Sequence, residues 1–288
     1  MDHPALLIFV QVTIFSLMLA VGLNHSRREF LSLWLQRGLL VRSLVAVIVL
    51  VPAMIVLLLY VFDLPLGVAT GLALLATAAG APLTTKRAEM AGGDSNYVAS
   101  LQLTLALLSV AVTPLTLKLF HELFVLDGEA VGVVDVAGQV AKVQFLPVVL
   151  GLALQHFVPK FAQRIGKPVA LLANVLFLLL VLLALVPGIK MTFALGGLPI
   201  LAIAIMVSGS LAIGHLLGGP ARAHRAGLAL ASIARNIGLA LFIATLANVE
   251  GGAMPTLLAY MILGALIALP YSIWNKRRLR GKPTSGAR

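Results

Sequence analysis

One arginine, Arg235, lies inside a long apolar stretch of this chain, in the segment ASIARNIG at residues 231–238. A guanidinium stays charged at physiological pH, and a charge at the centre of a membrane span costs at least about 2.5–3.5 kcal/mol. No acidic residue lies within the apolar stretches to neutralise it. Two interpretations follow. Either the arginine faces an aqueous cavity and binds a carboxylate, or backbone carbonyls at a helix break satisfy it.

The segment around the arginine has a counterpart in the first half of the chain. The tetrapeptide GLAL begins at Gly71, where LATAAGAPLTTKR follows it, and again at Gly227, where ASIARNIG follows it. Paired polar and helix-breaking interruptions in two halves point to the binding site of a transporter. The alternative is a pair of kinked helices packed through small residues. We predict that residues 79–85 and 232–238 leave regular helix and contact each other.

Hydroxyl and amide side chains accompany both interruptions. In the apolar run after the first interruption, Ser100 and Thr104 are four residues apart and share a helix face. Hydroxyls of this kind also serve as plain helix–helix contacts in membranes. The predicted substrate-binding residues are Arg235, Asn236, Thr84, Thr85 and Gln102. The candidate sodium ligands are Thr84, Thr85, Ser100 and Thr104.

Residues for other chemistries are missing or poorly spaced. The chain has no cysteine, and its histidines show no metal-binding pattern such as HExxH. Ser208, Ser210 and His215 share one apolar run, but the GxSG motif of intramembrane serine proteases is missing. We therefore expect no enzyme, no cofactor and no bound metal other than Na⁺. A non-transporting membrane sensor and a passive channel remain the alternatives.

The composition places these residues in a membrane. Hydrophobic residues make up 60% of the chain and charged residues 11%, against about 45–50% and about 25% in soluble domains. Apolar runs of about 18–22 residues recur, long enough as helices to cross roughly 30 Å of hydrocarbon. An all-α fold with nine spans is expected. The spans fall at about residues 4–23, 43–61, 66–84, 98–119, 140–158, 169–187, 198–217, 226–247 and 254–274.

Charge predicts the orientation of these spans. With the N-terminus outside, 17 of the 21 Lys and Arg fall on the cytoplasmic side, as basic residues do in membrane proteins. The same bias explains the net charge of +11, so nucleic-acid binding is not needed to account for it. The expected organisation is one membrane domain, residues 1–275, in a plasma or inner membrane. Its halves span about 1–120 and 140–275, and a basic cytoplasmic tail covers 276–288.

Several segments resemble the bile acid:sodium symporter family, over roughly residues 15–275. They are FSLMLAVGLNHSRREF (15–30), VLVPAMIVLLLYVFDLPLGVATGLALLATAAGAP (49–82), the pairs Gly93–Asp94 and Thr113–Pro114, SGSLAIGHLLG (208–218) and ARNIGLA (234–240). The resemblance implies inverted repeats, a core and a panel domain, and two broken helices that cross in the core. It also implies transport of a small organic anion by alternating access. The family's ten spans become nine because this chain starts one span late.

The resemblance also identifies departures at the sodium sites. Thr84 and Thr85 stand near the family's Ser-Asn sodium ligands, and Ser100 and Thr104 match its Ser and Thr pair. The second broken helix of the family has the frame Glu-x-Gly-x-Gln-Asn, which here is Ala231-Ser-Ile-Ala-Arg-Asn. We therefore expect weak or absent sodium coupling, with the arginine binding the anion or replacing one sodium. The expected partners are a small organic anion and the lipid bilayer, and the sequence does not indicate an oligomeric state.

Overall fold

The described part of the chain is helical throughout. The computed structural model describes residues 4–82, 84–129, 131–249 and 252–280. Within these ranges the one extended feature is an isolated bridge between two residues. Apolar helices are the expected solution because a helix satisfies its own backbone hydrogen bonds where no water can.

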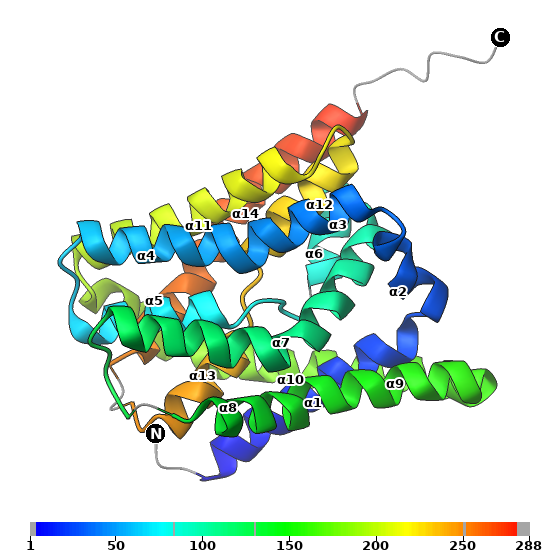
Figure 1. Ribbon diagram of the computed structural model, residues 1–288, viewed down its shortest axis with the longest axis horizontal. Helices are drawn as coiled ribbons and strands as arrows, with labels where there is room; N and C mark the ends of the chain where they lie inside the picture. Colours follow the sequence, from blue (N-terminus) through cyan, green and yellow to red (C-terminus); the bar gives the residue numbers. More distant parts are fainter. Residues whose placement is uncertain (1–3, 83, 130, 250–251, 281–288) are drawn as a thin grey trace.

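Sixteen helical elements follow one another, two of them short π-helices (Figure 1). They are α1 (Pro4–Asn24), α2 (Arg27–Trp34), α3 (Arg37–Leu44), η1 (Val45–Leu50), α4 (Val51–Val61), α5 (Leu66–Thr77), α6 (Thr84–Met90), α7 (Ser95–Leu123), α8 (Val133–Val140), η2 (Ala141–Phe145), α9 (Leu146–Phe157), α10 (Pro159–Ala194), α11 (Gly197–Leu217), α12 (Arg222–Ile233), α13 (Ile237–Leu246) and α14 (Met254–Arg280).

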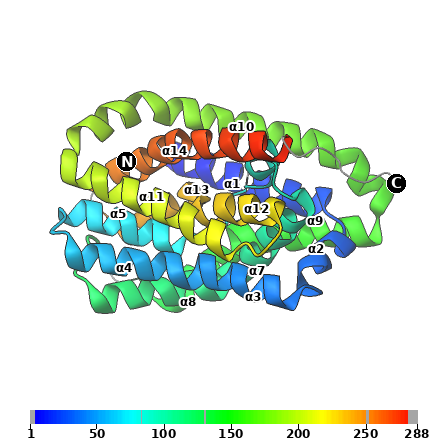
Figure 2. The same ribbon diagram turned by 90° about the horizontal axis from the view of Figure 1, so that it is seen from above.

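Successive segments run along the long axis of the molecule in alternating directions (Figures 1 and 2). One end holds the α2–α3, α6–α7, α9–α10 and α11–α12 connections and the last turn of α14. We call it the basic end, because Arg37, Lys86, Lys160 and Arg222 lie on these segments. The other end holds the α4–α5, α7–α8 and α10–α11 connections and the start of α14. The two ends therefore differ in charge as the sequence predicts.

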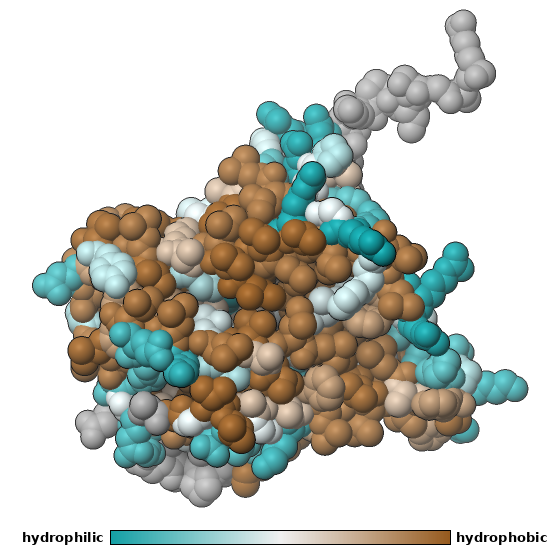
Figure 3. Space-filling view, viewed as in Figure 1, coloured by the Kyte–Doolittle hydropathy of each residue, from teal (hydrophilic) through white to brown (hydrophobic). Residues whose placement is uncertain are grey.

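A belt of apolar side chains lies between the two ends (Figure 3). Large apolar residues of α4 and α10 are exposed on the surface, among them Leu57, Val61, Leu171 and Leu182. Six of the described helices are long and apolar enough to cross a membrane, or seven if the bent pair α1–α2 counts as one span. Hydrocarbon is the solvent in which such a surface is stable.

The helices form two groups. Helices α1, α9 and α10 pack mainly on one another, and we call them the panel layer. The remaining helices surround a separate, larger apolar core. Within the panel layer α1 and α9 approach closely through Gly22 and Gly151, since a Cβ on Gly22 would lie 2.4 Å from the carbonyl oxygen of Val148. A smaller apolar cluster of α1 and α9 also includes Leu103 and Ala106 of α7, so the panel layer meets the rest of the molecule along α7.

Several predicted boundaries need correction. The spans 66–84 and 226–247 each divide into two half-helices, as their interruptions predict, but the first of them continues to Met90 and the second begins at Arg222. The predicted connection 120–139 is shorter, because α7 continues to Leu123 and α8 begins at Val133. Helix α10 begins at Pro159, inside a segment predicted to be a loop. Residues 281–288 of the predicted tail lie outside the described residues.

The segment between the first two spans contains a helix that the sequence did not suggest. Helix α2 turns by 88° from α1. Ser26 and Glu29 form a capping box, in which the Ser26 hydroxyl accepts from the Glu29 amide at 3.2 Å and the Glu29 carboxylate accepts from the Ser26 amide at 2.7 Å. Reciprocal caps of this kind fix where a helix starts.

Candidate functional site at the crossing of two broken helices

The two predicted interruptions meet. Helix α5 ends at Thr77 and α6 begins at Thr84, while α12 ends at Ile233 and α13 begins at Ile237. Ala79 pairs with Arg235 in the antiparallel bridge, and the Asn236 amide donates to the Ala78 carbonyl at 2.8 Å. The predicted break and contact are confirmed, although the non-helical residues, 78–82 and 234–236, are fewer than predicted.

Gly80 permits the turn in the first break. Its φ of +84° lies in the left-handed region, which glycine adopts without the steric cost that other residues incur. A Cβ at this position would also lie 3.1 Å from the Leu105 side chain. Gly80, one of the residues that suggested the break, is therefore the residue whose backbone makes the turn.

The C-terminal ends of α5 and α12 both point at the crossing, so their last carbonyls lack helical donors and carry partial negative charge. The Arg235 guanidinium lies against them. One terminal nitrogen, Nη1, donates to the Ala76 carbonyl of α5 at 3.3 Å. The hydroxyl of Tyr260 donates to the Ile233 carbonyl at the end of α12 at 2.8 Å. A fixed cation and a hydroxyl thus satisfy the exposed helix ends.

The second acceptor of Arg235 comes from the π-helix η1. Its other terminal nitrogen, Nη2, donates to the Val47 carbonyl at 3.2 Å. In η1 the Val51 amide donates to Ala46 instead of Val47. The next possible donor in π-helical spacing belongs to Pro52, which has no N–H. The π-helix and the proline together leave the Val47 carbonyl free for the arginine.

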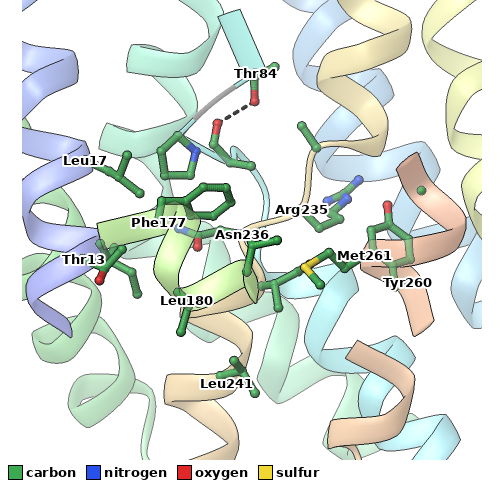
Figure 4. A pocket seen from close by; sticks show the side chains of 18 of the residues that line it. Thr13, Leu17, Thr84, Phe177, Leu180, Arg235, Asn236, Leu241, Tyr260 and Met261 are labelled. Carbon is green, nitrogen blue, oxygen red and sulfur yellow. Dashed lines mark hydrogen bonds between the residues drawn. The ribbon is translucent and has the colours of Figure 1, made fainter. Parts of the chain in front are cut away.

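These contacts are those of the second interpretation of Arg235, in which backbone carbonyls satisfy the charge. The side chain is 3% exposed. Among the described residues its Nε has no hydrogen-bond partner. Figure 4 shows the guanidinium beside the hydroxyl end of Tyr260. Binding of a substrate carboxylate by Arg235 stays a prediction.

Asn236 belongs to a buried polar chain that lies next to the panel layer. Its Nδ2 donates to the Gln144 Oε1 at 3.1 Å, and the Gln144 Nε2 donates to the Ser109 hydroxyl at 2.9 Å. The Asn236 Oδ1 also caps α13 by accepting from the Leu239 amide at 3.1 Å. Gln144 lies in η2, next to the panel layer. Sequence reasoning missed it, although a lone glutamine within an apolar run is a usable signal.

The predicted pair Thr84 and Thr85 separates into two environments. Thr84 lies at the start of α6 and donates to the Ala81 carbonyl at 2.5 Å. The Thr85 hydroxyl donates to the Gln102 Oε1 at 2.8 Å, and the Gln102 Nε2 donates to the Pro82 carbonyl at 2.6 Å. Gln102 and Thr85 therefore brace the first break from the α7 side.

Ser100 and Thr104 do share a helix face, but that face contacts α2. Ser100 donates to the Phe30 carbonyl and accepts from the Leu33 amide at 3.3 Å. Thr104 accepts from the Trp34 Nε1 at 3.1 Å. The pair thus fixes α2 against α7, and sodium binding by these oxygens stays a prediction.

A cavity of about 100 Å³ lies beside the crossing, between the panel layer and both breaks (Figure 4). Of the predicted site residues, Thr84, Arg235 and Asn236 line it, whereas Thr85, Gln102, Ser100 and Thr104 do not. The panel layer contributes mostly apolar side chains and the hydroxyl of Thr13, and α13 and α14 close the opposite side. The other lining residues include Thr13, Leu17, Phe177, Leu180, Arg87, Leu241, Tyr260 and Met261.

The lining favours an anion with an apolar body. Its polar side chains are hydroxyls, one amide and two guanidinium groups, with no carboxylate among them. No cluster of three or more potential metal ligands exists in the described part of the chain. The charged side chains that line the cavity among the described residues are therefore both cationic.

Comparison with known families identifies the chain. Residues 11–195 match the Sodium Bile acid symporter family. The chain belongs to this family. The match includes α5, α6 and the first break, whereas the second break with Arg235 lies beyond it. Family membership and the apolar helices make the chain a multi-pass membrane protein, and the resemblance seen in the sequence is confirmed. A search of curated proteins gives no match.

Proposed function

We propose that this chain is a secondary transporter of a small organic anion. The observation that carries the proposal is the cavity at the crossing, whose polar lining has guanidinium groups but no carboxylate. Membership of a symporter family also supports a transport function. Unwound backbone at membrane depth is tolerated where it lines a cavity, and broken helices of this kind form transporter sites.

The proposed topology has nine crossings, with the N-terminus outside and the C-terminus in the cytoplasm. The alternating course of the segments along the long axis supports it. The basic end would then face the cytoplasm. The proposed inverted repeat relates α5–α6 to α12–α13, which cross in opposite directions.

Movement would be by alternating access between the panel layer and the rest of the molecule. The larger apolar core includes no described residue of α1, α9 or α10, which supports a relative movement of two bodies that touch along α7. The buried hydrogen bond between Gln144 and Asn236 lies within the larger body, beside the panel layer.

Arg235 would do permanently what a coupling ion does transiently. Carbonyls at helix C-terminal ends and unwound backbone are the usual ligands of a transporter's sodium. Here the Arg235 guanidinium already takes the place of such an ion, because it donates to two carbonyls. Like charges at contact distance repel by several kcal/mol at the effective dielectric of a partly buried site. We therefore propose transport without sodium at this position.

Uptake by purified protein in liposomes tests the function. We expect saturable uptake of a radiolabelled small organic anion, with the same rate when choline replaces Na⁺. Liposomes without protein set the background. Absence of any saturable uptake across a set of anionic metabolites would contradict a transporter, and steep Na⁺ activation would contradict the role of Arg235 alone.

A further inference from the structure

Arg87 is the second guanidinium that lines the cavity. It lies on α6, three residues after Thr84, so both side chains share the face of α6 that lines the cavity. Among the described residues the structure gives Arg87 neither a side-chain hydrogen bond nor an ion pair. A charged donor with no protein acceptor at a cavity wall is available to a ligand.

The other polar side chains of the lining are already engaged. Arg235 is fixed by one bond from each terminal nitrogen to a backbone carbonyl, although its Nε has no partner among the described residues. Asn236 donates to a glutamine, and the hydroxyls of Thr13, Thr84 and Tyr260 each donate to a backbone carbonyl. Arg235 is therefore held in place by the crossing, whereas the hydrogen bonds and ion pairs of the described residues do not hold the Arg87 guanidinium.

The acids nearest in sequence do not compete for Arg87. Glu89 is two residues further along α6, a spacing at which helical side chains do not face each other. Asp94 caps α7 by accepting from the Tyr97 amide at 3.0 Å, and its carboxylate lies 3.5 Å from the His224 ring. The positive charge of Arg87 is thus left for a mobile anion.

The charge and size of the cavity limit the ligand. One uncommitted guanidinium balances one negative charge, and its planar fork fits a carboxylate. Leu17, Phe177, Leu180, Leu241 and Met261 offer apolar surface. A volume of about 100 Å³ is well below the roughly 300–1,000 Å³ of pockets for drug-sized ligands.

We propose that Arg87 binds the carboxylate of the substrate, and that the substrate is a compact monocarboxylate with an apolar body. This proposal rests on the proposed transport of an organic anion and assigns the anion-binding role to Arg87 instead of Arg235. Lys86, the adjacent basic residue, is exposed like Arg87 but does not line the cavity.

Ligand binding by purified full-length protein tests the assignment. The probes are acetate, pyruvate, isovalerate and benzoate, each paired with its uncharged amide, and glutarate as a dicarboxylate. We expect at least one monocarboxylate to raise the melting temperature of the wild type, and its amide to have no effect. Arg87→Gln should weaken that binding roughly 10–100-fold, the effect of losing hydrogen bonds to a charged group. Lys86→Gln removes the same charge one residue away and should bind as wild type.

The outcomes separate the two proposals. Unchanged binding by Arg87→Gln, equal weakening by Lys86→Gln, or equal binding of the amides would overturn the role of Arg87 while leaving an anion transporter in place. Glutarate as the only ligand would overturn the monocarboxylate class. No stabilisation or uptake of any anion would contradict the proposed function itself. If Arg87→Gln does not fold, Arg87→Lys replaces it and should bind less tightly than wild type, whereas Lys86→Arg should not.

Discussion

At the scale of single residues, we propose that Arg235 and Arg87 divide two tasks that one arginine was expected to perform. The first is buried and bonded to carbonyls from α5 and η1, while the second lines the same cavity without an acceptor among the described residues. A buried charge is tolerated where hydrogen bonds compensate it, and an exposed one can exchange ligands. The proposed division would keep the crossing fixed and leave the ligand-binding group free.

Replacing Arg235 should leave the buried carbonyls of Ala76 and Val47 without the donor that satisfies them and so lower the stability of the fold. In Arg235→Gln the shorter neutral side chain cannot reach both acceptors, so we expect a loss of roughly 1–3 kcal/mol of stability. Added Na⁺ should raise the melting temperature of this variant and leave the wild type unchanged. Arg235→Lys, which keeps the charge, serves as the control. A wild type that Na⁺ stabilises as strongly as the variant would contradict a built-in cation.

Residue types alone predicted part of this site. Arg235 and Asn236 stood out because charge and amide groups are rare in apolar runs, and both line the cavity. Ser100 and Thr104 were grouped with them because helical spacing shows which residues share a face but not which neighbour that face meets. Gln144 was missed for the same reason, since its partners lie on α7 and at the second break.

At the scale of elements, α2 connects the panel layer to the rest of the molecule through α7. It follows directly from α1, and its backbone and Trp34 bond to Ser100 and Thr104. A short helix rich in charge was not predicted because its pattern is that of a cytoplasmic loop. The breaks were predicted because polar and helix-breaking residues interrupt the apolar runs there, whereas the prolines that follow η1 and η2 did not by themselves indicate π-helices.

Removing the hydroxyls of Ser100 and Thr104 should loosen α2 and leave the response of the protein to Na⁺ unchanged. We expect the double variant Ser100→Ala/Thr104→Val to show faster amide hydrogen exchange over residues 27–34, because α2 loses its side-chain anchors. Thr113→Val is the control, since Thr113 bonds instead to the Thr77 carbonyl at 3.1 Å. Unchanged exchange in the double variant, or a lost response to Na⁺, would favour an ion site over an anchor.

The proline after η1 should have an effect opposite to the usual one. Proline inside a helix normally weakens it, so its removal is expected to stabilise. In Pro52→Ala a regained N–H would allow η1 to become regular helix and occupy the Val47 carbonyl that Arg235 needs, so we expect a lower melting temperature. Pro270→Ala, inside α14, is the control and should not destabilise. A stabilised Pro52→Ala would show that the arginine does not depend on the π-helix.

At the scale of the whole molecule, the proposed orientation follows from the separation of charge between the two ends. A reporter active only in the cytoplasm should give signal when fused after Arg288 and none when fused near Gly128. Gly128 lies in the α7–α8 connection, at the end opposite the basic end. Expression of both fusions is the control, and the reverse pattern would rule out nine crossings in this orientation.

The fixed position of Arg235 has an electrical consequence. A cation built into the chain returns with the carrier in every cycle, so the net charge moved is that of the substrate alone. One negative charge moved across 100 mV changes in free energy by about 2.3 kcal/mol, roughly a 50-fold change in equilibrium concentration. In a cell with a negative interior, such a carrier would favour export of a monoanion. In liposomes, an interior-negative potassium diffusion potential should therefore slow uptake and speed efflux, whereas rates independent of voltage would indicate that another ion travels with the substrate.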